Sequence, residues 1–202
     1  MLKRTLDLLL ASVGLVVLAP LGLVIALWIR LDSPGPALFR QSRVGCGGRL
    51  FRIHKFRTMR ADAGAGGPAL TVGDDPRITR AGRWLRRAKL DELPQLIDVI
   101  AGDMSLVGPR PEVPGYVALY PAALRDKLLS VRPGITDPAS LAYVDEGTRL
   151  AASADPQRAY VDEVLPAKLA LSAQYIDRMS TGGDLRLLLA TLRRVWWRAW
   201  RP

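Results

Sequence analysis

The longest apolar run in the chain lies near its start. Residues Leu8 to Ile29 include no charged side chain, and as a helix rising about 1.5 Å per residue they are long enough to cross a hydrocarbon core of about 30 Å. Arg30 and a turn sequence at residues 32–36 follow, where a signal peptide would have a small-residue cleavage site. The pattern therefore predicts a retained membrane segment.

Basic residues flank this run on both sides, with Lys3 and Arg4 before it and Arg30 after it. Because basic flanks favour the cytoplasmic side, both ends are satisfied there if the segment enters and leaves by the same face. Pro20, near the middle, removes a backbone donor and can break the helix for that purpose. A single kinked span fits the residues equally well, so both topologies stay open at this point.

A period of two follows the apolar run. Residues Leu38 to Phe56 alternate apolar and polar positions on both sides of a glycine-rich turn, which predicts a β-hairpin that supplies most of the strand content. Residues 61–75 are small, rich in glycine and without periodicity, so we expect a loop there, placed over a site.

Helical periodicity begins at Asp75, where Pro76 suits a first helical turn. Arginines recur there every three residues and predict a strongly positive helix face; they are Arg77, Arg80, Arg83 and Arg86. A second helix is predicted from Asp91 to Ile100, ending at Gly102. Further along we expect a loop at 102–111, a helix at 116–129, a turn at 131–136 and a helix at 166–178.

The last periodic stretch, Leu185 to Trp200, combines leucines at helical spacing with arginines and three tryptophans, Trp196, Trp197 and Trp200. Such a helix suits the headgroup region of a membrane, where an aromatic ring meets both apolar and wet surroundings. The alternative is a helix packed on the domain with solvated arginines. Together the patterns predict a mainly α fold with a small β-hairpin, in which residues 1–31 form the membrane anchor and 32–202 one compact catalytic domain.

Charge narrows the classes of partner. Lysine and arginine outnumber aspartate and glutamate 29 to 19, for a net charge of +10, which favours anionic partners such as lipid headgroups or phosphorylated molecules. Nucleic acid is disfavoured because the basic residues adjoin the apolar run and the aromatics lie in an amphipathic helix. The single Cys46 cannot form an internal disulfide, and the single His54 fits ordinary strand packing.

Asp91 and Glu92 are the candidate chemical groups. Arg86, Arg87 and Lys89 precede them, and nearby cations favour the ionised form of a carboxylate. An ionised carboxylate can attack a phosphoryl group or bind a metal. Because a diphosphate substrate is itself anionic, a Mg²⁺ ion held by Asp91, Glu92 and phosphate oxygens would bring the charges together.

Three arginines are candidates for binding the phosphates. Arg110 and Arg132 each lie in a proline-bracketed turn that restricts the guanidinium, and Arg86 belongs to the basic row. Ordinary interpretations exist for both features. Acidic residues are favoured in the first turn of any helix, and a basic helix face suits anionic lipid. From residue types alone the helix-cap interpretation of Asp91 and Glu92 is the stronger one.

Six ordered blocks change that balance. They are Lys3-Arg4 with Asp7; Ser33-Pro34-Gly35-Pro36 with Phe39-Arg40-Gln41, Arg43 and Gly45; Lys55-Phe56-Arg57-Thr58-Met59; Leu90-Asp91-Glu92-Leu93-Pro94-Gln95-Leu96; Gly102 to Pro111; and Arg132-Pro133-Gly134-Ile135-Thr136. Together they cover residues 3–136 and resemble the bacterial sugar transferase family, the monotopic phosphoglycosyl transferases.

The resemblance implies a specific reaction. A sugar-1-phosphate passes from a nucleotide diphosphate sugar, expected to be a UDP-sugar, to undecaprenyl phosphate, through a covalent intermediate on an aspartate in the position of Asp91. Glu92 would be its partner and Mg²⁺ the cofactor. The resemblance also implies a re-entrant membrane helix broken near Pro20, a catalytic domain on the cytoplasmic face of a bacterial inner membrane, anionic lipid as a partner and the start of a surface glycan. A homodimer is compatible with the sequence.

The chain departs from the family pattern at two places. Ala19 stands before the helix-breaking proline, where some members have serine. After Thr136 the chain reads Asp137-Pro138-Ala139-Ser140, where many members have a Gly-Trp-Ala-Gln stretch that leads to a phosphate-binding arginine. Arg149 is a candidate substitute for that arginine.

Two alternatives of other classes stay open. The first is a non-catalytic polybasic membrane scaffold of a glycan assembly system, in which Asp91 and Glu92 only cap a helix. The second is a metal-dependent phosphohydrolase at the membrane, which would turn over without a polyprenyl phosphate acceptor.

Overall fold

The computed structural model describes residues 2–61, 70–71, 73 and 75–200, without the side chains of residues 198–200. Helices dominate it and confirm the predicted mainly α class. In chain order the α-helices are α1 (Leu2–Asp32), α2 (Arg80–Arg87), α3 (Gln95–Ala101), α4 (Pro114–Val117), α5 (Ala122–Leu129), α6 (Pro138–Ala142), α7 (Glu146–Ala151), α8 (Pro156–Ala159), α9 (Leu165–Asp177) and α10 (Thr181–Trp200). The loop predicted for 61–75 falls largely on residues 62–69, 72 and 74, outside the described part.

The predicted hairpin is confirmed. Strands β1 (Leu38–Val44) and β2 (Leu50–Phe56) pair antiparallel along their full length, from Leu38 opposite Phe56 to Val44 opposite Leu50. A short 3₁₀ turn at Cys46–Gly48 joins them, with Gly47 and Gly48 at positive φ angles that L side chains rarely adopt.

A second, parallel strand pair was not predicted. Strands β3 (Ser105–Val107) and β4 (Gly134–Thr136) lie where we expected a loop and a turn, and they pair through Ser105 with Gly134 and Val107 with Thr136. Gly134 permits this approach, since a Cβ there would lie 2.0 Å from the backbone nitrogen of Gly108. The pairing joins the segment after α3 to the segment after α5.

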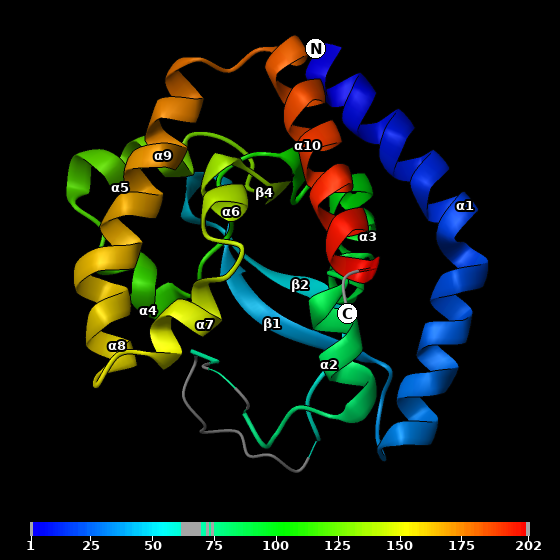
Figure 1. The fold of residues 1–202 in the computed structure, drawn as a ribbon. Coiled ribbons are helices and arrows are strands. Elements are labelled where there is room, and N and C mark those ends of the chain that lie inside the picture. Colours follow the sequence, from blue (N-terminus) through cyan, green and yellow to red (C-terminus); the bar gives the residue numbers. More distant parts are fainter. Residues whose placement is uncertain (1, 62–69, 72, 74, 201–202) are drawn as a thin grey trace.

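Helix α1 is one uninterrupted helix of 31 residues that passes through Pro20. The helix is not divided into two segments at Pro20, but Figure 1 shows that it bends near its middle. A proline inside a helix removes one hydrogen bond and commonly produces a bend of this kind. Among the described residues one helix, α1, is both long enough and apolar enough to cross a membrane.

The two ends of α1 are bound to the rest of the chain by polar contacts. At the start, Arg4 donates to the carbonyl of Val99 at the end of α3 (2.8 Å), and buried Asp7 accepts from the Ser105 hydroxyl (2.7 Å). At the other end, buried Arg57 donates to the Ser33 carbonyl (2.6 Å) and hydroxyl (2.9 Å). Between these ends most large side chains of α1 are exposed.

Several predicted helix boundaries are corrected. Helix α2 begins at Arg80 with the Thr79 side chain as its cap, and not at Asp75, because Asp75 instead accepts hydrogen bonds from the Arg77 side chain in the preceding turn. The helix predicted for 116–129 is two short helices that meet near Pro121. The helix predicted for 166–178 is confirmed as α9 and the last one as α10.

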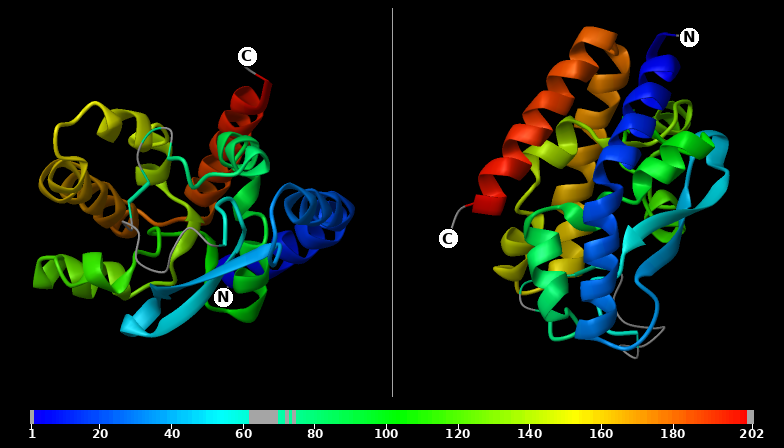
Figure 2. Two further views of the ribbon diagram at one scale, coloured as in Figure 1. Left: turned by 90° about the horizontal axis from the view of Figure 1, so that it is seen from below. Right: turned by 90° about the vertical axis from the view of Figure 1, so that its right-hand side faces the viewer.

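The elements form two bodies of packing around the hairpin. Figures 1 and 2 show α1 along one side of the molecule, next to α2 and α3, and α9 with the short helices α4 to α8 on the other. One core cluster joins α1 and α3 to the strands and includes Ala11, Ile53, Val99 and Met104. A second lies under α9 and includes Tyr116, Leu150, Tyr160 and Leu169. His54 packs in the strand as expected, with its ring nitrogen 2.6 Å from Asp98.

Candidate active site

Asp91 and Glu92 lie in a 3₁₀ turn, η2 (Leu90–Glu92), and not in the first turn of an α-helix. Lys89 enters the turn with a left-handed φ of 55°, the one positive φ among the described residues other than glycine. Helix α3 starts three residues beyond Glu92, at Gln95, with Pro94 as its cap residue. The two acids therefore stand outside the helix that they were expected to begin, which removes the main support for the helix-cap interpretation.

Glu92 is held by two cations on two sides. The Arg110 guanidinium donates to both carboxylate oxygens, at 3.0 Å to Oε2, and Lys55 Nζ donates to Oε1 at 3.0 Å. Burial alone would raise the pKa of Glu92, but Arg110 and Lys55 hold that pKa well below its ordinary value. Glu92 is thus a fixed anion whose oxygens are already in use.

Asp91 has a different environment although it is the next residue. Its side chain is buried, and its Oδ1 has no hydrogen-bond partner. Burial, and then the charge of Glu92, raise the pKa of Asp91, while Lys55, Lys89 and Arg86 act in the opposite direction. The expectation that neighbouring cations stabilise the ionised form thus holds for Glu92, whereas for Asp91 burial outweighs them. Asp91 is therefore the more basic and the less satisfied of the two carboxylates.

Arg86 faces this site from α2. Its Nε donates to the Thr58 hydroxyl at 2.9 Å, and its charge and that of Asp91 interact. The helix is fixed closely against the same threonine, because a Cβ on Gly82 would lie 2.0 Å from the Thr58 carbonyl oxygen. The contact between α2 and the end of β2 therefore sets where Arg86 can reach.

The role of Lys55 in this geometry was not predicted from the sequence. Lys55 comes from β2 and meets Glu92, while Arg57, two residues later, binds the end of α1. The end of one strand thus contacts both the membrane segment and the carboxylate pair. The block Lys55 to Met59 was part of the family resemblance, which was the available signal, but no pattern of spacing pairs a strand lysine with a glutamate 37 residues away.

The other two candidate arginines lie in different places. Arg110 is in the site, bound to Glu92. Arg132 is exposed, and its Nε donates to the carbonyl of Gly102 at 2.9 Å. Gly102 follows the end of α3, a helix about 10 Å long, whereas Asp91 precedes its start. The structure thus brings Asp91, Glu92, Arg86 and Arg110 together but leaves Arg132 at the far end of α3.

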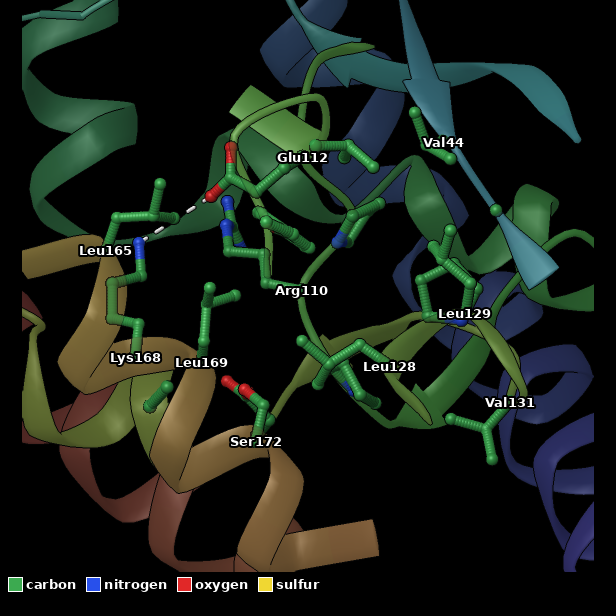
Figure 3. A pocket seen from close by; sticks show the side chains of 18 residues that line it. Val44, Arg110, Glu112, Leu128, Leu129, Val131, Leu165, Lys168, Leu169 and Ser172 are labelled. Carbon is green, nitrogen blue, oxygen red and sulfur yellow. Dashed lines mark hydrogen bonds and ion pairs between the residues drawn. The ribbon is translucent and has the colours of Figure 1, made fainter. Parts of the chain in front are cut away.

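A pocket lies beside Arg110. Figure 3 shows Arg110 and Glu112 at the top of it, Lys168 and Ser172 of α9 toward the left and below, and Leu128 and Leu129 of α5 on the right. Lys168 Nζ lies 3.7 Å from Glu112 and 2.9 Å from Glu146. The pocket therefore connects the carboxylate site to the second core cluster through a row of paired charges.

Comparison with known proteins decides the family. A family model described as bacterial sugar transferase matches residues 1–198 of the chain. The chain belongs to the bacterial sugar transferase family. It is 40% identical over 192 residues to a UDP-glucose:undecaprenyl-phosphate glucose-1-phosphate transferase of Caulobacter vibrioides, covering 94% of this chain and 68% of that protein.

Other members of the family differ in length. The chain is 39% identical over 197 residues to the exopolysaccharide production protein PSS of Rhizobium leguminosarum bv. phaseoli, covering 95% of this chain and 93% of that one. It is 38% identical over 198 residues to an undecaprenyl-phosphate glucose phosphotransferase of Komagataeibacter xylinus, covering 95% of this chain but 35% of that protein. The bacterial sugar transferase part thus forms nearly all of one relative and about a third of another.

The structure locates this sugar transferase's departure from the family pattern after Thr136. Asp137 is fully buried, caps α6 through the Ser140 backbone and accepts from the Ser172 hydroxyl at 2.7 Å. Arg149, the candidate substitute for the family arginine, is exposed on α7 and lies over the Tyr143 ring, 5.9 Å from its centroid. The divergent segment is therefore built around a buried aspartate, and Arg149 does not contact the carboxylate pair.

The donor set of this sugar transferase fits one mode of magnesium binding. Among the described residues no group of three histidine, cysteine or carboxylate side chains could hold a metal ion. Both oxygens of Glu92 are occupied by Arg110 and Lys55, while Asp91 Oδ1 is unpartnered. Mg²⁺ commonly takes one or two protein carboxylates and completes its shell with substrate phosphates and water. The residues thus fit an ion held by Asp91 and the substrate, with Glu92 outside its shell.

Proposed function

We propose that this protein transfers a sugar-1-phosphate from a UDP-sugar to undecaprenyl phosphate and so begins the synthesis of a surface glycan. The observation that carries the proposal is the pair of unlike carboxylates. Asp91 is buried with a free oxygen among Lys55, Lys89 and Arg86, next to a Glu92 that is fully engaged. The family and the activities for which the Caulobacter and Komagataeibacter relatives are named agree with this chemistry.

The reaction takes two displacements at one phosphorus. An Asp91 oxygen attacks the phosphorus that carries the sugar, the bond from that phosphorus to the bridging oxygen breaks, and UMP leaves with the electron pair. An oxygen of undecaprenyl phosphate then attacks the same phosphorus, and the acyl phosphate bond breaks to restore the Asp91 carboxylate. No net proton is needed, and splitting the transfer this way replaces one hard step by two easier ones.

Each neighbouring residue has a proposed part. Arg86 binds an oxygen of the transferred phosphate, because it already faces Asp91 from α2. Glu92, fixed by Lys55 and Arg110, orients the turn that carries Asp91. A magnesium ion, when bound, neutralises charge on the diphosphate. Phosphate binding by Arg110 and by Arg132 stays a prediction. Because the Arg110 guanidinium already donates to Glu92, it would have to bind a phosphate through its remaining N–H groups.

The membrane arrangement is also a proposal. We infer that α1 enters and leaves the bilayer by one face, with residues 1–31 as the anchor and 32–202 as the catalytic domain. Polar groups bind both ends of α1 to one body, through Arg4 and Asp7 at one end and Arg57 at the other. A full span would carry those groups, and the charged site packed along the helix, into hydrocarbon, where unpaired or charged groups are costly.

The same reasoning places α10 at the interface. Its exposed side chains include Leu185, Leu189, Leu192, Trp196 and Trp197, whereas Asp184 is buried and binds Lys3 at 2.6 Å. A helix with leucine and tryptophan on one exposed surface and arginines between them suits the headgroup region. Because nucleotide sugars are cytoplasmic, the domain would lie on the cytoplasmic face of the inner membrane.

The test is release of UMP by purified protein in nanodiscs with Mg²⁺, a panel of UDP-sugars, and undecaprenyl phosphate present or absent. We expect sustained UMP release with one sugar only when the acceptor is present, and a radiolabelled sugar that enters the lipid phase. Sustained release of UMP or phosphate without acceptor would favour a phosphohydrolase and contradict the proposal. No UMP with any sugar would favour the scaffold.

A further inference from the structure

The arginines of α2 are divided between two faces of the helix. Arg86 points to the carboxylate site and is half-buried, whereas Arg80, Arg83 and Arg87 are exposed. Residues four and seven positions apart share a helix face, so Arg80, Trp84 and Arg87 form one stripe with Arg83 beside it. The sequence pattern described a single positive face, but the fold assigns one arginine inward and three outward.

An exposed tryptophan pair lies on the outward side. Trp84 of α2 packs against Trp28 of α1 with ring centroids 5.6 Å apart, and the two residues stay 44% and 39% exposed. Next to Trp28 the membrane segment exposes Val24, Leu27 and Leu31. The basic stripe of α2 is therefore continuous, through two indole rings, with the apolar surface of α1.

The corner between α1 and α2 is rigidly held. The Asp32 carboxylate at the end of α1 accepts from the backbone nitrogen of Ala81 at 2.9 Å, so one helix caps the other. Gly82 fixes α2 against Thr58, as described above. Leu85 is fully buried in a cluster with Ile25 and Ile29 of α1. The outward side chains thus stand on a fixed frame and not on a loop.

This surface leads directly to the candidate nucleophile. Arg87 and Asp91 are four residues apart, and an extended chain of that length spans at most about 14 Å. Between them Lys89 is exposed and acts electrostatically on Asp91. Arg87 therefore lies within about 14 Å of Asp91 along the chain, with the exposed cation of Lys89 between them.

We propose that Trp28, Arg80, Arg83, Trp84 and Arg87, the outer face of α2, form the docking surface for the polyprenyl phosphate acceptor. The arginines receive the phosphate, and the indole pair and α1 receive the first isoprene units. Charge and polarity complement such a lipid, because one end of this surface is cationic and the other apolar. The inference rests on the proposed function and adds the place where the second substrate enters, while Arg86 serves the donor.

The test separates the Michaelis constants of the two substrates. Both constants are measured in detergent micelles of fixed composition, the acceptor KM with undecaprenyl phosphate and the donor KM with the UDP-sugar. The variants are Trp84→Ala and the double variant Arg83→Ala/Arg87→Ala. We expect the acceptor KM to rise about fivefold for each arginine removed, with the donor KM and kcat unchanged. Trp84→Phe and Arg87→Lys should recover most of the loss.

Matched controls lie elsewhere in the chain. Trp197→Ala removes an exposed tryptophan on α10, and Arg125→Ala removes an exposed arginine on α5, and neither should change the acceptor KM. Two further measurements distinguish acceptor docking from general adhesion to the membrane. They are the KM for farnesyl phosphate, a short acceptor, and sedimentation with vesicles of anionic phospholipid.

Three outcomes would overturn the inference while leaving the proposed function intact. The acceptor KM is unchanged in the α2 variants, or both KM values and kcat change together, or vesicle binding falls while the KM for farnesyl phosphate stays at the wild-type value. If wild-type protein releases no UMP with any sugar, the proposed function fails instead. A selective rise in the KM for both acceptors supports the inference.

Discussion

Two buried clusters of paired charges lie near each other and differ in whether each buried carboxylate oxygen has a partner. Around Glu112, Lys168 lies at 3.7 Å and the Tyr160 hydroxyl donates at 3.1 Å, and nearby Asp137 is bonded through both oxygens. Around Glu92 the pairing is equally close, but Asp91 beside it keeps one buried oxygen without a partner. A buried polar atom without a partner costs stability, and among the described residues Asp91 Oδ1 is the one carboxylate oxygen in that state.

Structural and reactive carboxylates in this fold can thus be told apart by whether their oxygens have hydrogen-bond or ion-pair partners. The Glu112 cluster has cations and donors for its carboxylates and joins β1, α7 and α9. In the Glu92 cluster both cations, Lys55 and Arg110, bind Glu92, so an oxygen of Asp91 stays available to a substrate. Substitutions in the two clusters test whether this difference in hydrogen-bond partners corresponds to a difference in function.

Asp91→Asn should have the largest effect on turnover. The amide keeps the shape but cannot attack phosphorus, so we expect UMP release to fall on the order of 10⁴-fold with little change in thermal stability. Initial rates and a melting curve, both recorded in nanodiscs, measure the two quantities. Asp162→Asn, at an exposed carboxylate paired with Arg158, is the control and should keep wild-type rates. Wild-type turnover in Asp91→Asn would end the proposed role of Asp91.

Glu92→Gln should reduce kcat by a smaller factor, about 100-fold. The variant removes the anion that fixes Lys55 and Arg110, so the turn that carries Asp91 loses its orientation, although Asp91 itself is intact. Single-turnover kinetics should show the loss in UMP release and not in donor binding. If Glu92→Gln abolished turnover while Asp91→Asn retained it, the two roles would have to be exchanged.

Arg86→Lys should have an intermediate effect on the donor. Lysine keeps the charge but cannot donate to Thr58 and to a phosphate oxygen in the same fixed plane, so we expect the donor KM to rise about tenfold. Titration with UDP-sugar at saturating acceptor measures this. Arg80→Lys on the outer face is the matched variant and should leave the donor KM unchanged, and equal effects of the two would remove the division of α2 into two faces.

Lys168→Met should have the smallest effect on turnover and a large one on stability. It leaves Glu112 and Glu146 without their shared cation, at a cost of about 3–5 kcal/mol, while kcat per folded molecule stays near wild type. Denaturant titration and active-site counting separate the two quantities. Adding Glu112→Gln should recover part of the lost stability, because one of the unpaired charges is then removed. A kcat that falls without a loss of stability would mean that the Glu112 cluster belongs to the reaction.

The sequence predicted the elements whose signal is local. The apolar run of α1, the alternation around Gly47 and Gly48, and the helix end at Gly102 each depend on neighbours a few residues away, and the structure confirms them. Strands β3 and β4 could not be predicted in the same way, since each has three residues and its partner lies far along the chain. Their pairing depends on the close approach of Gly108 and Gly134, which only the tertiary fold creates.

The candidate site was predicted in part. Spacing and resemblance pointed to Asp91, Glu92, Arg86 and Arg110, and the structure places these four together. The left-handed Lys89 and the late start of α3 at Gln95 moved the acids out of the expected helix. The partnership of Glu92 with Lys55, and the opposite pKa shifts of two adjacent carboxylates, come from burial and from contacts between distant segments, which residue spacing does not encode.

The contact between Lys3 and Asp184 joins residues 181 positions apart, and this has a consequence for synthesis. A ribosome makes α1 well before Asp184, so Lys3 at the start of α1 meets this partner only once the beginning of α10 has been made. During that interval Lys3 and Arg4 are available to lipid phosphates. Under the proposed membrane arrangement, α1 would already lie at the bilayer surface while the later helices are still being made, and those helices would then close onto it.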